Sequence, residues 1–135
     1  IIVIGNHDNP ASFGKTHALD LFGQLPLQGF YVIAQPQTII VQTKKGPVQI
    51  VGIPWPSKTT LALNKIGILQ TDTTGDYISK AVGSIIEHHA QKLNPELPAV
   101  LTAHLTVSSA LFSGSEKRAL CGRDPVFLPS QLAIK

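Results

Sequence analysis

The order of apolar runs along the chain is the feature that most constrains its fold. Short runs at residues 1–4, 30–34, 48–53 and 99–104 have the length of strands and end at glycine, proline or polar residues. A longer segment, residues 75–93, instead spaces its apolar side chains as a helix does. Because strands and helices that alternate along a chain are typical of layered folds, we predict an α/β fold.

Residues 75–93 carry the clearest helical pattern, which ends at Asn94-Pro95. A second helix is predicted to begin at Asn9-Pro10, with asparagine as the cap and proline at the first helical position, and to stop at Gly23. A third, short helix is predicted for residues 57–64. The apolar stripe of the long helix consists of Ile78, Ala81, Val82, Ile85, Ile86 and Ala90.

Residues 38–43 and 48–53 are joined by Lys44-Lys45-Gly46-Pro47, which predicts a β-hairpin and therefore a mixed rather than a purely parallel sheet. The Pro54-Trp55-Pro56 sequence should break the second strand of this hairpin. Residues 105–125 are predicted to form a loop with little regular structure.

The composition suits one globular domain. The chain has 135 residues, of which 43% are hydrophobic and 14% charged. A formal net charge of +3 permits contact with nucleic acid, but the basic residues are scattered and do not outline a binding face. One cysteine excludes an internal disulfide and fits a reducing compartment. No segment has the length and apolarity of a membrane span.

The chain contains no methionine and opens inside a predicted strand. We therefore expect residues 1–135 to be an internal piece of a longer protein. We also expect no signal peptide, because residues 1–4 lack a basic leader.

The tetrapeptide Gly5-Asn6-His7-Asp8 directly follows the first predicted strand. Gly5 permits a sharp turn there, and Asn6 offers an amide oxygen that can ligate a cation. His7 can ligate a metal or transfer a proton, and Asp8 can orient it. Turn preferences alone explain the glycine, asparagine and aspartate but not the histidine. Since α/β sheets place ligands at the carboxyl ends of strands, the tetrapeptide is a candidate site.

His104 is the second candidate, because it also ends an apolar strand and imidazole is a common metal ligand. A lone histidine more often bonds a neighbouring carbonyl group. Two strand-end histidines that could face one cleft, His7 and His104, favour a site instead. His88 and His89 lie late in the long helix, where positive charge suits the helix C-terminus, and are predicted to be exposed.

Residues 4–8, followed by Asn9-Pro10 and a predicted helix, resemble the third motif of calcineurin-like metallophosphoesterases, and more narrowly that of the SbcD nuclease family. Asn9 stands where that family usually has serine. Residues 53–56 are similar to the family's turn after a hairpin. Residues 103–107 and 113–118 are similar to its later ligand-bearing strand and its Ser-Glu-rich loop. The resemblance implies a fragment of the layered α/β/β/α sandwich with a mixed sheet.

The resemblance also implies a role for each residue. Asn6 and His104 would be metal ligands. His7 would be the catalytic histidine that protonates the leaving oxygen or stabilises the transition state, and Asp8 would hold it. In the family two divalent ions, typically manganese, activate a water and clamp the phosphodiester for in-line attack.

The family's Asp-X-His, Gly-Asp and Gly-His-X-His motifs are expected outside the chain, so residues 1–135 would form a partial nuclease domain. Asn6 and His104 are neutral ligands, and without a bridging carboxylate they cannot hold a divalent pair tightly. We therefore expect the isolated chain to be inactive.

By resemblance, the parent protein would be a metal-dependent exonuclease and endonuclease acting on DNA ends and hairpins in the cytoplasm. It would form a homodimer and work with an SbcC-type ATPase. It would not bind a membrane. Two alternatives stay open: a metallophosphoesterase for a small phosphoester, and an inactive structural or binding fragment.

Overall fold

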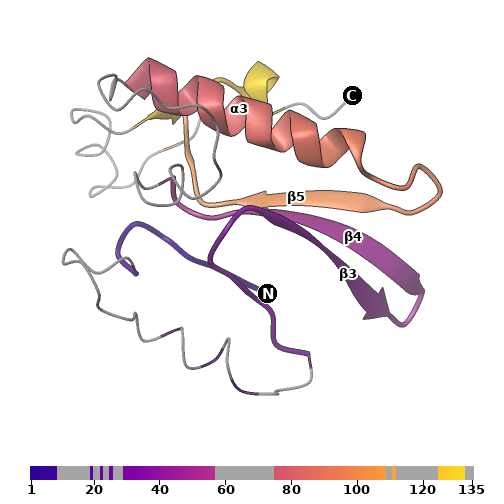
Figure 1. Ribbon diagram of the computed structural model, residues 1–135. Coiled ribbons are helices and arrows are strands. Elements are labelled where there is room, and N and C mark those ends of the chain that lie inside the picture. Colours follow the sequence, from indigo (N-terminus) through magenta and orange to yellow (C-terminus); the bar gives the residue numbers. More distant parts are fainter. Residues whose placement is uncertain are drawn as a thin grey trace. The chain divides into compact units, whose positions relative to one another are not determined.

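A computed structural model of the chain describes residues 1–8, 19, 22, 25, 29–56, 75–108, 111 and 125–132 (Figure 1). The helices predicted for residues 9–23 and 57–64 lie outside this described part, apart from single positions. The chain divides into two compact units. The first comprises Ile1–Trp55 and Asn94–His104, and the second comprises Pro56–Leu93 and Leu105–Lys135.

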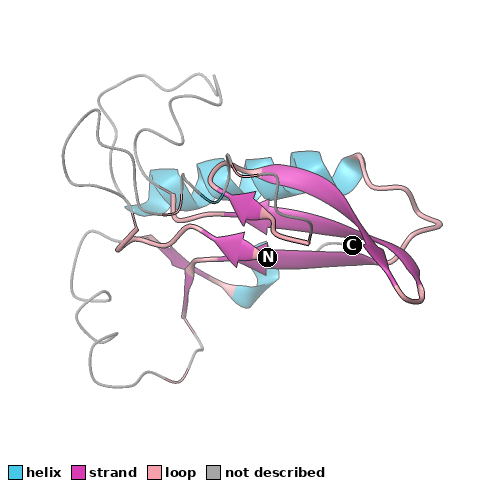
Figure 2. Ribbon diagram, turned by 90° about the horizontal axis from the view of Figure 1, so that it is seen from below, coloured by secondary structure: helices cyan, strands magenta, loops and turns pink. Residues whose placement is uncertain are grey.

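The described residues of the first unit form five strands in two sheets. Strand β1 (Ile2–Val3) pairs in parallel with β2 (Val32–Ile33). Strands β3 (Gln37–Thr43), β4 (Gly46–Ile53) and β5 (Ala99–Ala103) form the second sheet in that order. Strand β3 is antiparallel to β4 and β5 is parallel to it, which confirms the prediction of a mixed sheet. Figure 2 shows β3 and β4 as a long twisted hairpin.

The hairpin turn is tighter than the sequence predicted, because only Lys44-Lys45 connects the strands. Gly46, assigned to the turn, begins β4 and pairs with Thr43, and its φ of 118° explains the need for glycine. The Thr43 hydroxyl accepts the Lys45 N–H at 3.2 Å and donates to the Gly46 carbonyl at 2.6 Å. Pro47 lies within β4 opposite Gln42.

Branched side chains fill the core of the first unit. Ile33 packs directly over Gly52, where a Cβ atom would approach the Ile33 Cδ1 atom to 2.2 Å, so only glycine fits this position of β4. Ile1, the first residue of the apolar run at residues 1–4, is exposed. The core residues are Ile4, Ile33, Ile50, Val51, Ile53 and Pro54.

Gln49 is a buried polar residue in the middle of this sheet, with 4% of its surface exposed. Its side-chain amide donates to the carbonyl oxygens of Asn94 at 3.0 Å and Leu97 at 3.3 Å. Its side-chain oxygen accepts the Asn94 N–H at 2.8 Å. One side chain of β4 therefore satisfies three backbone groups of the segment that leads into β5.

The second unit is built on helix α3 (Gly75–Gln91), whose buried residues include four of the predicted stripe: Ala81, Val82, Ile85 and Ile86. Strands β6 (Thr106–Val107) and β7 (Val126–Phe127) pair in parallel, and the short helix η1 (Pro129–Gln131) follows.

Helix α3 packs against β7, where the Ser79 hydroxyl donates to the Val126 carbonyl at 3.4 Å. Strand β6 corrects the prediction of a loop at residues 105–125, which missed it because a two-residue strand has no measurable period. In the described part of the chain, no helix has both the length and the apolarity needed to cross a bilayer.

Candidate metal site

The carboxyl ends of β1, β4 and β5 are joined by backbone hydrogen bonds. The Trp55 N–H donates to the Ile4 carbonyl at 2.9 Å, just beyond the ends of β4 and β1. The His104 N–H donates to the Ile53 carbonyl, also at 2.9 Å. The extension of β4 thus lies between β1 and β5, and the residues that follow all three strands emerge at one edge, where α/β sheets bind ligands.

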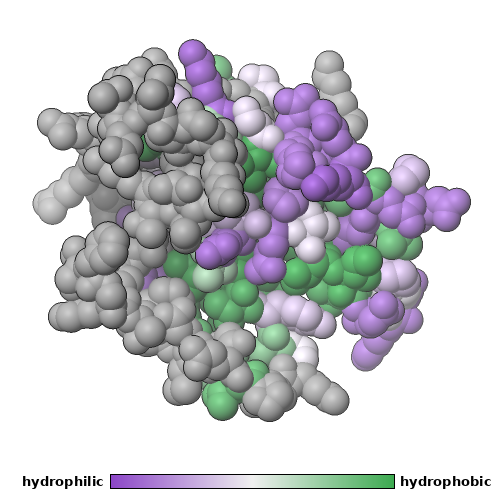
Figure 3. Space-filling view, viewed as in Figure 1, coloured by the Kyte–Doolittle hydropathy of each residue, from purple (hydrophilic) through white to green (hydrophobic). Residues whose placement is uncertain are grey.

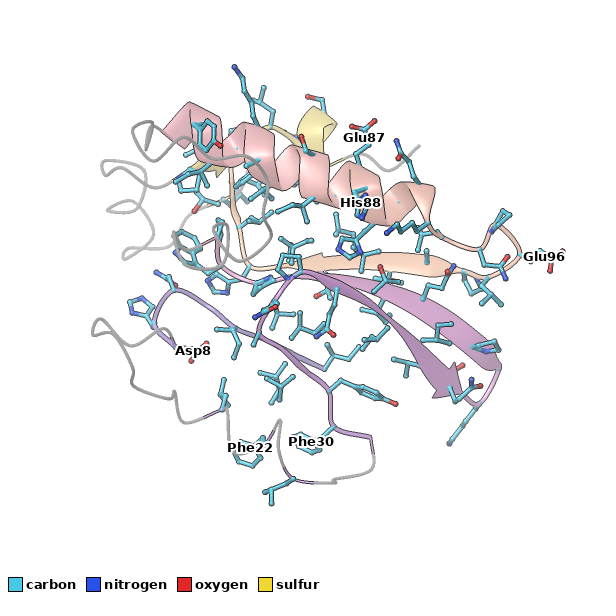
Figure 4. The ribbon with its side chains drawn as sticks, viewed as in Figure 1. Asp8, Phe22, Phe30, Glu87, His88 and Glu96 are labelled. Carbon is cyan, nitrogen blue, oxygen red and sulfur yellow. The ribbon has the colours of Figure 1, made fainter. Side chains whose placement is uncertain are left out.

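The loop after β1 is a compact turn closed by Asp8. The Gly5 N–H donates to the Asp8 Oδ2 atom at 2.8 Å, and the Asp8 N–H donates to the Gly5 carbonyl at 3.3 Å. Figure 4 shows the Asp8 side chain beside this loop. Because the two ends of the turn are tied, Asn6 and His7 lie at its tip, and both are exposed.

Asn6 and His104 meet although 98 positions separate them. The Asn6 Oδ1 atom lies 3.2 Å from the His104 Nε2 atom, a hydrogen-bond distance when that nitrogen carries the proton. Both side chains are exposed, so burial does not force this contact. Two of the predicted site residues are therefore brought together beyond the carboxyl ends of β1 and β5.

The His104 ring is also held by Gly5 and Trp55. A Cβ atom at position 5 would lie 2.8 Å from the His104 Cε1 atom and 3.0 Å from its Nδ1 atom, so the ring rests directly on the glycine backbone. The Trp55 ring meets the imidazole edge-on, with centroids 5.8 Å apart and planes at 80°. Three different contacts thus fix the orientation of an exposed histidine.

The spacing of the Asn6 and His104 donor atoms fits one side of a metal site. Two donors that each lie about 2.1 Å from a cation are roughly 3.0–3.4 Å apart at octahedral or tetrahedral angles. The observed 3.2 Å falls in this range. An amide oxygen with an imidazole nitrogen suits borderline ions such as manganese or zinc. Within the described residues, no group of three or more histidine, cysteine, aspartate or glutamate side chains could hold a metal ion.

The remaining predicted residues have simpler surroundings. The carboxylate of Asp8 bonds the Gly5 backbone and thereby shapes the loop that carries His7. That Asp8 also holds the His7 imidazole is a separate contact, and it stays a prediction. The Ser-Glu-rich loop at residues 113–118 lies outside the described residues.

His88 and His89 behave differently from each other at the end of α3. His88 is exposed, as predicted, whereas His89 is half-buried. Their rings meet edge-on with centroids 5.8 Å apart. Burial lowers the pKa of His89 below 6.5, and the nearby positive charges of His88 and Lys92 lower it further. These causes outweigh the helix C-terminus, which favours a charged imidazole.

Trp55 is the site residue whose role the sequence did not indicate. From the sequence, Trp55 was considered only as part of the Pro54-Trp55-Pro56 break after the hairpin, and not as a neighbour of His104. The only available indication was its position two residues after Ile53, whose strand pairs with β5 and so ends beside His104.

Comparison with known proteins gives no independent assignment. No protein-family model matches the chain, and no curated protein is significantly similar to it.

Proposed function

We propose that this chain forms part of the nuclease site of an SbcD-like metallophosphoesterase, which hydrolyses phosphodiester bonds at DNA ends and hairpins. The observation that carries the proposal is the contact between Asn6 and His104. Both follow strands whose carboxyl ends are linked through the extension of β4 by backbone hydrogen bonds, and their donor atoms have the separation of two ligands of one cation. The sequence motif supplies the choice of family.

In this proposal each residue has a distinct task. Asn6 and His104 present an amide oxygen and an imidazole nitrogen to one of two divalent ions, with manganese as the expected metal. The bound ions would supply charge stabilisation and a water nucleophile at neutral pH. His7, exposed at the tip of the loop, donates a proton from its imidazole to the leaving oxygen of the phosphodiester. Asp8 keeps the loop closed through the Gly5 N–H.

The two proposed ligands, Asn6 and His104, are not enough for a pair of metal ions, so the proposal requires further ligands. Asn6 and His104 are both neutral, and a pair of divalent ions needs carboxylate ligands, one of them bridging. We propose that such carboxylates lie outside the 135 residues, in a parent protein with the α/β/β/α sandwich. The expected partners of that parent are an SbcC-type ATPase, a second copy of itself and DNA, in the cytoplasm.

The direct test is an assay of the parent protein on linear duplex DNA and on p-nitrophenyl phosphate, both with manganese. We expect cleavage of DNA, and a loss of about 10²–10⁴-fold in kcat for His7→Gln because general acid catalysis is removed. His88→Gln, a histidine outside the site, should leave the rate unchanged. Hydrolysis of p-nitrophenyl phosphate without DNA cleavage would point to a small phosphoester instead. Full DNA cleavage by His7→Gln would contradict the assigned role.

A further inference from the structure

The turn between β3 and β4 carries the positive charge of an otherwise uncharged hairpin. Neither strand contains lysine, arginine, aspartate or glutamate, so the charge of the hairpin comes from the two turn residues, Lys44 and Lys45. Both lysines are exposed. Figure 3 shows hydrophilic residues at the turn and apolar residues over the strands. This adjacent pair of lysines therefore lies at one end of a neutral two-stranded ribbon.

The turn end of the hairpin extends past the third strand of its sheet. Strand β5 pairs with β4 from Gln49 onward, so residues 41–48 have no third strand beside them in the described part of the chain. The Thr43 hydroxyl bonds the Lys45 N–H and the Gly46 carbonyl, which holds the turn closed. Residues 41–48 thus form a projecting two-stranded arm, called the β3–β4 arm, that presents both lysines.

The β3–β4 arm lies at the opposite end of β4 from the candidate metal site. Strand β4 runs from Gly46 to Ile53, and the Ile53 carbonyl accepts the His104 N–H at the site. The strand has eight residues, and seven steps of about 3.3 Å place the turn roughly 23 Å from this end. Because successive phosphates of one DNA strand are about 3.4 Å apart along the helix axis, this span matches roughly seven base pairs.

The β3 side of the sheet offers an uncharged path between the arm and the site. The exposed positions of β3, which include Ile40 and Gln42, are all neutral, so they do not repel a polyanion. The acidic residue Glu96 belongs to the segment that leads into β5, and β4 separates β5 from β3. A nucleic acid that runs along β3 would therefore meet positive charge at the arm without passing an acidic side chain of the hairpin.

We propose that the β3–β4 arm is a second contact for duplex DNA, with Lys44 and Lys45 against phosphates about seven base pairs from the bond that is cleaved. The position of that bond rests on the proposed function, whereas binding by the arm does not. Ammonium groups that neutralise phosphates release counterions, which supplies affinity without reading the sequence. A lipid surface fits the arm less well, because residues 43–46 have no apolar side chain to insert.

Fluorescence anisotropy of a labelled duplex with the 135-residue chain in EDTA tests the arm separately from the metal site. Lys44→Gln combined with Lys45→Gln should weaken binding at least fivefold at low salt. The dependence of log affinity on log salt concentration should become shallower by about 1.8, because each phosphate contact contributes about 0.9. Lys80→Gln combined with Lys92→Gln is the matched control, since it removes two exposed charges elsewhere, and it should change affinity less than twofold.

Three results of this measurement would overturn the proposal. The first is a chain that does not bind the duplex in EDTA. The second is an equal loss of affinity in the two double variants, because the lysines of the arm would then act only through net charge. The third is competition by polyglutamate as effective as that by DNA of equal charge, because the arm would then fit an acidic protein.

The span is tested with the parent protein, manganese and DNA hairpins whose stems are shorter or longer than about seven base pairs. We expect kcat/KM to be at least fivefold higher for the longer stems. The double variant of Lys44 and Lys45 should lose this preference while cleaving the short stems at an unchanged rate. Equal kcat/KM for both stems in the unmodified parent would overturn the proposed span. A parent that cleaves neither stem would contradict the proposed nuclease function, and the measurement in EDTA would still decide whether the arm binds DNA.

Discussion

At the scale of single residues, His104 is held from three sides by unrelated interactions. The Gly5 backbone supports the ring face, the Trp55 indole meets it edge-on, and Asn6 approaches Nε2. An exposed imidazole would otherwise populate several rotamers and lose entropy on binding a cation. Orienting the ring in advance reduces this cost. The absence of a side chain at Gly5 therefore permits the turn and also allows the His104 ring to take its observed orientation.

Gly5→Ala should disturb this arrangement, because the added Cβ would lie 2.8 Å from the His104 Cε1 atom. We expect the imidazole to tilt away and the free energy of unfolding to fall by about 1–3 kcal/mol from overpacking. Chemical denaturation measures the second effect, and the nuclear Overhauser contact between Trp55 and His104 measures the first. Gly83→Ala is the control, since a Cβ there meets nothing within 4 Å. An unchanged Trp55–His104 contact in Gly5→Ala would contradict this reading.

At the scale of elements, the three-stranded sheet of the first unit depends on a polar side chain. Gln49 of β4 bonds the backbone of Asn94 twice and that of Leu97 once, and so fixes the entry into β5. Strand β5 in turn places His104. The hydrogen bonds of Gln49 thus support the pairing of β4 with β5 at the start of β5, the opposite end of that strand from His104.

Gln49→Leu keeps the approximate volume but removes three hydrogen bonds to partly buried backbone groups. Because a hydrogen bond contributes about 0.5–1.5 kcal/mol, we expect a loss of about 1–3 kcal/mol in urea denaturation. Gln42→Leu, on the exposed face of β3, should change stability by less than about 0.5 kcal/mol. Equal losses for the two variants would mean that the Gln49 hydrogen bonds contribute nothing.

The end of α3 predicts a pH dependence. Since the folded pKa of His89 lies below 6.5, the folded state binds its proton less readily than the unfolded state. Its contribution to stability is complete above pH 6.5 and is lost as the pH falls through 6.5 toward the lower folded pKa. Lys92→Gln should raise the pKa of His89, as measured by NMR titration. A pKa for His89 above 6.5 would be inconsistent with its burial.

The elements differ in how well the sequence predicted them. Helix α3 and strands β2 to β5 were predicted within a few residues, because each carries a clear apolar period or a β-branched run. The hairpin turn was placed two residues too long, since Gly46 and Pro47 read locally as turn residues. Strand β6 was missed because its pairing with β7 depends on residues distant in sequence.

At the scale of the whole molecule, the candidate site brings together Asn6, near the first residue of the first unit, and His104, its last residue. The sequence indicated that Asn6 and His104 each follow a strand. It could not indicate that these strands flank the same extension of β4, because that depends on long-range pairing. The role of Trp55 was missed for the same reason. Local pattern thus identified the candidate ligands, and topology placed them within 3.2 Å of each other.

The central claim is that Asn6 and His104 form one side of a metal site. Substoichiometric Mn²⁺ added to the chain, followed by NMR of the histidine ring protons, tests it most directly, because paramagnetic broadening falls steeply with distance. We predict that the His104 signals broaden well before those of His88, and that Asn6→Ala removes this preference. Binding should be weak, because both ligands are neutral. Broadening of His88 before His104, or a His104 response unchanged by Asn6→Ala, would contradict the account.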